Sequence, residues 1–99
     1  MSHPPFVEIL KEKDPLLYEA VEKVREAAFA GNALDLKTKF LICMALDAAH
    51  GAGPGVKTLS QLARQHGATE EEIKETLRLV YYIAGNNALA ANQFGYERG

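Results

Sequence analysis

Helix start and stop signals recur along the whole chain, and they constrain its fold more than any other feature. Asp14-Pro15 pairs a capping residue with a proline in the first helical turn, where the missing N–H costs nothing. Gly31 ends the helix that begins there. Asp35 caps a second helix, over 37–50, which is apolar on most of its circumference. Because no stretch shows the alternation typical of strands, the sequence predicts an all-α fold.

The second half of the chain carries three further predicted helices. The first runs over 56–66 and ends at Gly67. Thr69 and Glu72 form a capping box at the start of the next helix, which we expect to end at Gly85. A short helix over 87–94 follows. We expect inward-facing side chains on the Thr69-capped helix at Ile73, Leu77, Val80, Tyr81 and Ala84.

These segments predict one compact domain of about five helices over residues 1–99. Residues 1–13 are expected to form an N-terminal arm, and residues 95–99 a frayed tail.

Composition excludes several classes of function. The 99 residues carry a net charge of only -2, and their basic residues do not cluster, so a nucleic-acid surface is not expected. The single cysteine rules out an internal disulfide and favours a reducing compartment. No apolar segment is long enough to span a bilayer, and the first residues do not read as a signal peptide. We therefore expect a cytoplasmic protein without membrane contact.

The stretch HGAGPGVKT, residues 50–58, is close to the phosphate-binding pattern G-x-x-x-x-G-K-[ST]. Val56 replaces the glycine that should precede Lys57, and its β-branch resists the positive φ that glycine allows. A predicted helix, not a strand, leads into the stretch. The stretch is therefore interpreted as a connector between two helices and not as a nucleotide site.

Three motifs, in order, carry a resemblance to a known family. They are L-D-x-K-T-K at 34–39, G-A-T-E-E-E-I at 67–73, and a tyrosine-rich segment that ends in Ala84-Gly85. Together they resemble the carboxymuconolactone decarboxylase-like family, which includes the alkylhydroperoxidase-D-like proteins, over about Phe6 to Phe94. The resemblance implies an all-α fold and a symmetric homo-oligomer, a trimer or a hexamer.

The resemblance also implies where this family's redox site should lie. Its peroxidase branch uses a C-x-x-C pair, a histidine four residues later, and a glutamate in the preceding helix. With G-A-T-E-E-E-I as the anchor, the two cysteines fall at Ala52 and Gly55, the histidine at Leu59, and the glutamate at Phe40. All four positions are vacated. The decarboxylase branch is expected to keep the histidine for a small lactone acid, so Leu59 departs from that branch too.

Several polar residues remain as candidates for a site. His50 is either a relocated acid–base group or a histidine favoured by the end of its helix. Cys43 is either a nucleophile or a small buried hydrophobe. Lys57 and Arg64, seven residues apart, either bind a carboxylate or are solvated charges.

Tyr82, near three asparagines, either lines a pocket or packs in the core. His66 reads as a second histidine at a helix end. His3 lies in the arm, and no spacing of the histidines suggests a metal site.

Three functions therefore stay open. The first is a homo-oligomer with proton-transfer or decarboxylation chemistry on a small acid. The second is a non-catalytic helical oligomer that binds a small ligand or a partner protein. The third is residual hydroperoxide reduction through Cys43 alone. No cofactor is expected for any of them.

Overall fold

The computed structural model describes residues 4–99, and their regular structure is helical throughout, without a strand. The predicted all-α fold is confirmed. The described residues fall into two compact units, one that ends at Ala33 and one that runs from Leu34 to Gly99. His3 lies outside the described residues.

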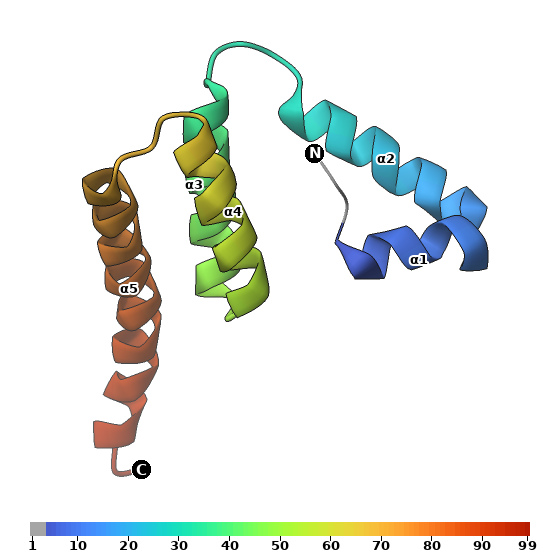
Figure 1. Ribbon diagram of the computed structural model, residues 1–99. Helices are drawn as coiled ribbons and strands as arrows, with labels where there is room; N and C mark the ends of the chain where they lie inside the picture. The colour runs from blue at the N-terminus through green and yellow to red at the C-terminus, as the bar shows by residue number, and fades with distance from the viewer. Residues whose placement is uncertain (1–3) are drawn as a thin grey trace. The chain divides into compact units, whose positions relative to one another are not determined.

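The first unit is a pair of helices, α1 (Pro5–Lys13) and α2 (Pro15–Phe29), which contact each other (Figure 1). Asp14 joins them, and the backbone N–H of Leu17 donates to its Oδ1 at 3.1 Å, as the capping signal predicted. Lys11 lies 5.4 Å from the centre of the Tyr18 ring and so links the two helices. Neither helix buries a residue.

Helix α1 occupies most of the segment that we expected to form an arm, and the sequence analysis did not predict this helix. It begins at Pro5, which suits a first turn because it needs no N–H donor there. Pro4 precedes it and supplies no side-chain cap, so the usual polar start signal is missing. The helical spacing of Phe6, Ile9 and Leu10 was the signal that could have revealed it.

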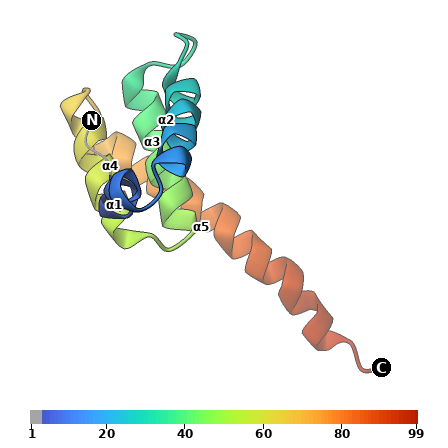
Figure 2. The same cartoon turned by 90° about the vertical axis from the view of Figure 1, so that its right-hand side faces the viewer.

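The second unit contains α3 (Leu36–Ala49), α4 (Gly53–Gln65) and α5 (Glu70–Asn92), followed by the short 3-10 helix η1 (Gln93–Tyr96). Helix α3 packs against both α4 and α5. The apolar side chains that become buried come from all three helices, and they are Phe40, Met44, Ala63 and Ile73. The second half of α5 continues past the ends of α3 and α4 (Figure 2).

Two boundary predictions in this unit are wrong. Gly85 does not end a helix, because its φ is not positive and the chain continues as α5 to Asn92. The predicted short helix over 87–94 is therefore the last part of α5, continued by η1. Helix α4 begins at Gly53 and not near Val56, since Pro54 is acceptable in a first turn.

The expected inward face of the Thr69-capped helix is only partly right. Ile73 is buried, and Val80 is half-buried. Leu77, Tyr81 and Ala84 are exposed, with 82% of Tyr81 accessible to solvent. These three side chains lie on a helix that extends past its partners, so periodicity alone could not tell which of them would be covered.

Candidate functional site

The turn between α3 and α4 is where the family resemblance places the redox site. Two hydrogen bonds shape it: Gly51 N–H donates to the Ala48 carbonyl at 3.1 Å, and Ala52 N–H donates to the Asp47 carbonyl at 2.9 Å. This paired pattern is a Schellman helix end, and it needs the left-handed φ of 75° at Gly51. The turn therefore has a defined backbone and is not an open loop.

The vacated positions lie on the elements around this turn. Phe40 is buried in α3, where its ring centre lies 5.1 Å from that of His66 with the planes tilted by 48°. Ala52 precedes α4 and makes no side-chain capping bond, and Gly55 lies in the first turn of that helix. Leu59 is half-buried on α4. None of these four residues has a side chain that can transfer a proton or act as a nucleophile.

Asp47 is the acidic side chain closest to this turn, and sequence reasoning missed it. Its carboxylate lies against Gly55, so closely that a Cβ added at Gly55 would overlap Oδ2 and come within 2.9 Å of Cγ. Asp47 is itself half-buried on α3. No sequence signal pointed to this contact, because it joins residues on two helices across a glycine-rich turn.

Cys43 lies one turn before Asp47 on α3, in a half-buried position. Burial raises the pKa of the Cys43 thiol, and the negative charge of Asp47 raises it further. Both effects disfavour the thiolate, which is the nucleophilic form. The interpretation of Cys43 as a small, weakly reactive hydrophobe therefore fits the structure better than a nucleophile does.

His50 and His66 make equivalent contacts at two helix ends. The Nδ1–H of His50 donates to the Leu46 carbonyl at 2.7 Å, and that of His66 donates to the Leu62 carbonyl at 2.9 Å. A carbonyl oxygen only accepts, so each ring must carry its proton on Nδ1 and leave Nε2 exposed. Both histidines are exposed and cap the ends of α3 and α4.

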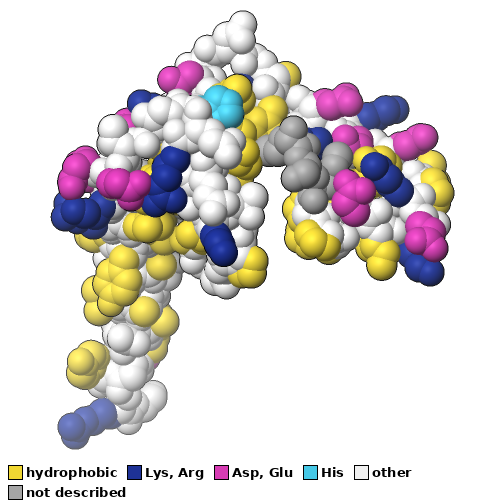
Figure 3. All heavy atoms as spheres, in the orientation of Figure 1, with side chains coloured by type: hydrophobic (Ala, Val, Ile, Leu, Met, Phe, Trp, Pro, Cys, Tyr) yellow, Lys and Arg dark blue, Asp and Glu magenta, His cyan; other side chains and the backbone are white. Residues whose placement is uncertain are grey.

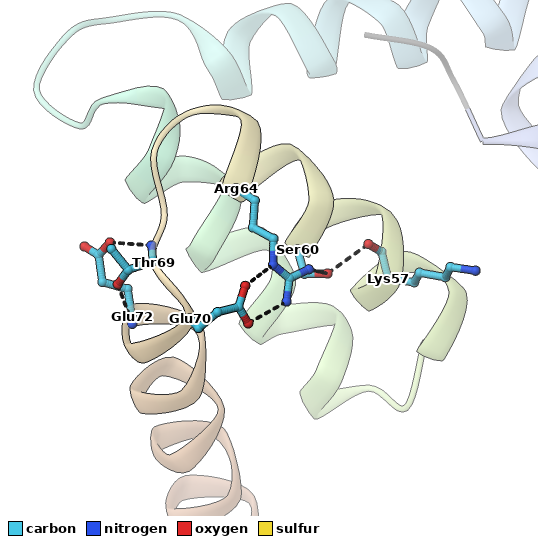
Figure 4. Close-up of polar contacts among 6 residues, drawn as sticks. All are labelled: Lys57, Ser60, Arg64, Thr69, Glu70 and Glu72. Carbon is cyan, nitrogen blue, oxygen red and sulfur yellow. Dashed lines mark hydrogen bonds and ion pairs between the residues drawn. The ribbon is translucent and has the colours of Figure 1, made fainter.

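Arg64 and Lys57 are not brought together as a carboxylate-binding pair. Arg64 donates from Nε and Nη2 to the two carboxylate oxygens of Glu70, at 2.6 and 3.1 Å. Its Nη1 reaches the Ser60 hydroxyl at 3.3 Å. In Figure 4 the Lys57 side chain points away from this ion pair. The guanidinium of Arg64 thus already has a carboxylate partner. Lys57 is also exposed and lies apart from that ion pair.

The N-terminus of α5 is fixed by a second polar cluster. The Thr69 hydroxyl accepts from the Glu72 N–H at 3.1 Å, and the Glu72 carboxylate accepts from the Thr69 N–H at 2.9 Å (Figure 4). The predicted capping box is therefore confirmed. Glu72 also accepts a hydrogen bond of 2.9 Å from Lys37 on α3. That bond, together with the capping bond, holds the pKa of Glu72 below its usual value.

Tyr82 lies on α5 with 64% of its surface exposed. Within residues 4–99 there is no group of three or more histidine, cysteine or acidic side chains with a geometry suited to a metal ion. None of the helices over the same residues combines the length and apolar character needed to cross a membrane.

Comparison with known proteins decides the family. The model of the carboxymuconolactone decarboxylase family matches residues 15–95. The chain belongs to this family. The match covers the whole of α2, α3, α4 and α5. The chain has a single cysteine, so this member of the carboxymuconolactone decarboxylase family has no C-x-x-C pair.

Two relatives of this member of the carboxymuconolactone decarboxylase family come from Methanocaldococcus jannaschii. The chain is 35% identical over 79 residues to uncharacterized protein MJ1511, which covers 80% of the chain and 74% of that relative. It is 32% identical over 80 residues to uncharacterized protein MJ0742, and this match covers 80% of the chain and 77% of that relative. No solved structure gives a significant match.

Proposed function

We propose that this chain works as a homo-oligomer of the carboxymuconolactone decarboxylase family without thiol peroxidase activity. The apolar surface of α5 carries the proposal. The run 79–84, LVYYIA, covers every side of the helix, since successive residues point about 100° apart. Leu79, Tyr82 and Ile83 are 65, 64 and 59% exposed. A helix that is apolar all round is normally buried between other elements.

The last part of α5, after this run, continues beyond the end of α3 (Figure 2). Helix α5 has 23 residues and α3 has 14, which corresponds to lengths of about 34 Å and 21 Å. About 13 Å of α5 therefore has no equally long neighbour in α3. Figure 3 shows hydrophobic side chains along this part of α5. Leu89 and Phe94, further along, are 66 and 64% exposed.

Copies of the same chain are the partner that we propose for this surface. Each copy carries the same apolar residues, so a closed symmetric assembly covers them in every subunit. The first unit, by itself, also buries no residue on α1 or α2, and α2 carries Leu16 and Val24, exposed by 81 and 69%. A trimer or a hexamer is the form that the family resemblance implies.

The association state tests this part of the proposal. At micromolar concentration the parent protein should sediment as more than one chain. Ile83→Glu places a charge in the apolar run and should raise the dissociation concentration at least tenfold. Asn87→Glu, one turn further along α5 at an exposed polar position, should leave association unchanged. A parent protein that sediments as a single chain would remove the basis of the proposal.

The chemistry that we propose is proton transfer on a small acid, with His50 as the acid–base group. The bond from Nδ1 to the Leu46 carbonyl fixes the tautomer and leaves Nε2 as the exposed basic nitrogen. Lys57, exposed on α4, supplies a positive charge for a carboxylate. Tyr82 and Arg64 remain weaker candidates for binding, since Arg64 is already paired with Glu70.

A non-catalytic oligomer that binds a small ligand or a partner protein is the second candidate, and one observation favours it. His66 makes the same bond at the end of α4 that His50 makes at the end of α3. A purely structural role would therefore explain both rings. Residual hydroperoxide reduction is the weakest candidate, because burial and Asp47 raise the pKa of Cys43.

Paired variants separate these candidates. A small unsaturated lactone acid is offered to the parent, to His50→Gln and to His66→Gln. Turnover that is lost only in His50→Gln supports proton transfer, whereas no turnover in any of them supports the non-catalytic oligomer. In a parallel assay with an organic hydroperoxide and a dithiol, we expect no reduction. Reduction that disappears in Cys43→Ser would contradict the absence of thiol chemistry.

A further inference from the structure

The contact between Asp47 and Gly55 restricts which residues fit at position 55, beside the turn between α3 and α4. Gly55 lies in the first turn of α4 with a φ that other residues adopt easily, so its backbone does not require glycine. An alanine there would normally favour the helix. The requirement comes from Asp47, whose carboxylate fills the space that a Cβ would need.

Asp47 also has a physical reason to hold this place. Helix α4 begins without a side-chain cap, because Ala52 has no side-chain acceptor and Pro54 has no N–H to offer. A carboxylate beside the first turn of a helix is favoured by the positive end of the helix dipole. The carboxylate of Asp47 therefore lies beside the end of α4 that favours a negative charge.

We propose that Asp47, held beside the first turn of α4 by its negative charge, disfavours every side chain at position 55, a cysteine included. Two restored cysteines would therefore place a side chain at position 55 against Asp47, and the Asp47 side chain would have to move. The statement about cysteine also rests on the family resemblance, which places the family's pair at Ala52 and Gly55. The statement about side chains at position 55 rests on the contact itself.

A double-mutant cycle tests the contact. Gly55→Ala should lower the melting temperature by several degrees in the parent background and raise it in the Asp47→Ala background. The matched control is Gly53→Ala, also in the first turn of α4 but with no atom within 4 Å of its added Cβ. This control should shift the melting temperature equally in both backgrounds. Gly55→Ala behaving like Gly53→Ala in both backgrounds would mean that the Asp47 side chain simply rotates away, and the proposal would be wrong.

A second arm tests the consequence for cysteine. The pair Ala52→Cys with Gly55→Cys is made with Asp47 present and with Asp47→Ala, and each protein is oxidised with glutathione disulfide. Two thiols then lose two protons and two electrons to form one disulfide, while glutathione disulfide becomes two glutathione thiols. The disulfide should form at least tenfold faster with Asp47→Ala, and equal rates would overturn the claim about cysteine.

The double-mutant cycle, the oxidation experiment and the association measurement each test a different claim, and each can contradict its own claim without affecting the others. A monomeric parent protein would contradict the proposed function but leave the sign reversal at Gly55 intact. A missing sign reversal would contradict the role of Asp47 and leave the oligomer unaffected. Asp47→Asn adds a further distinction, because it keeps the shape of the side chain and removes its charge. Gly55→Ala should still destabilise the protein in that background.

Discussion

Truncation of Met44 should remove a large part of the stability of the second unit. Met44 is the largest side chain with no solvent exposure among the described residues, and it lies on α3, the helix that packs against both α4 and α5. Met44→Ala loses the burial of three heavy atoms and leaves a cavity, which together cost about 2–5 kcal/mol. A chain of this size is typically stable by only about 5–15 kcal/mol, so the loss should be plain in an unfolding curve.

The matched control is Leu46→Ala, two residues further along the same helix. Leu46 is 57% exposed, so its truncation should change the unfolding free energy of the isolated chain by no more than about 0.5 kcal/mol. Urea unfolding, followed by circular dichroism at two protein concentrations, measures both variants. A transition that moves to higher urea at higher concentration reports self-association. A Met44→Ala loss below about 1 kcal/mol, or one equal to that of Leu46→Ala, would refute the assignment of the core.

Three further predictions follow from the site and its surroundings. Bonds to Lys37 and Thr69 lower the pKa of Glu72 in the folded protein. The stabilisation by Glu72 is therefore complete above its unfolded pKa near 4.5 and is lost as the pH falls through the lower folded pKa. In an acid titration, Glu72→Gln should lose less stability than the parent. Asp47→Asn should move the pH profile for alkylation of Cys43 to lower pH, whereas Glu75→Gln, an exposed acid on α5, should leave the profile in place. Leu59→Ala should cost about 1–2 kcal/mol by chemical denaturation, below the loss for a fully buried leucine because Leu59 is half-buried, and Leu59→His should also destabilise the protein. A histidine variant that is as stable as the parent and turns over a lactone acid would contradict the interpretation of Leu59 as a packing residue.

The sequence alone determined the helical class and most of the helix ends. These features depend on residues a few positions apart. The capping bonds of Asp14, Asp35 and Thr69 join residues three apart, and each was found where its residue type predicted it. The family assignment likewise followed from the order of local motifs and was confirmed over residues 15–95.

Local signals failed where a residue type allows two outcomes. Glycine ends a helix only when it adopts a left-handed φ, as Gly51 and Gly67 do. Gly85 has the helical alternative available and takes it, so α5 continues. Pro54 fits a connector and a first helical turn equally well, and the structure has it in the turn.

Only the tertiary structure decided which groups meet across helices. Three contacts join residues on different helices. They are the ion pair of Arg64 with Glu70, the ion pair of Lys37 with Glu72, and the approach of Asp47 to Gly55. Periodicity marks the apolar residues of α5 but not how far its neighbours reach along it. Burial and ion pairing depend on helix length and packing direction, and these are set by contacts between segments, which local sequence patterns do not encode.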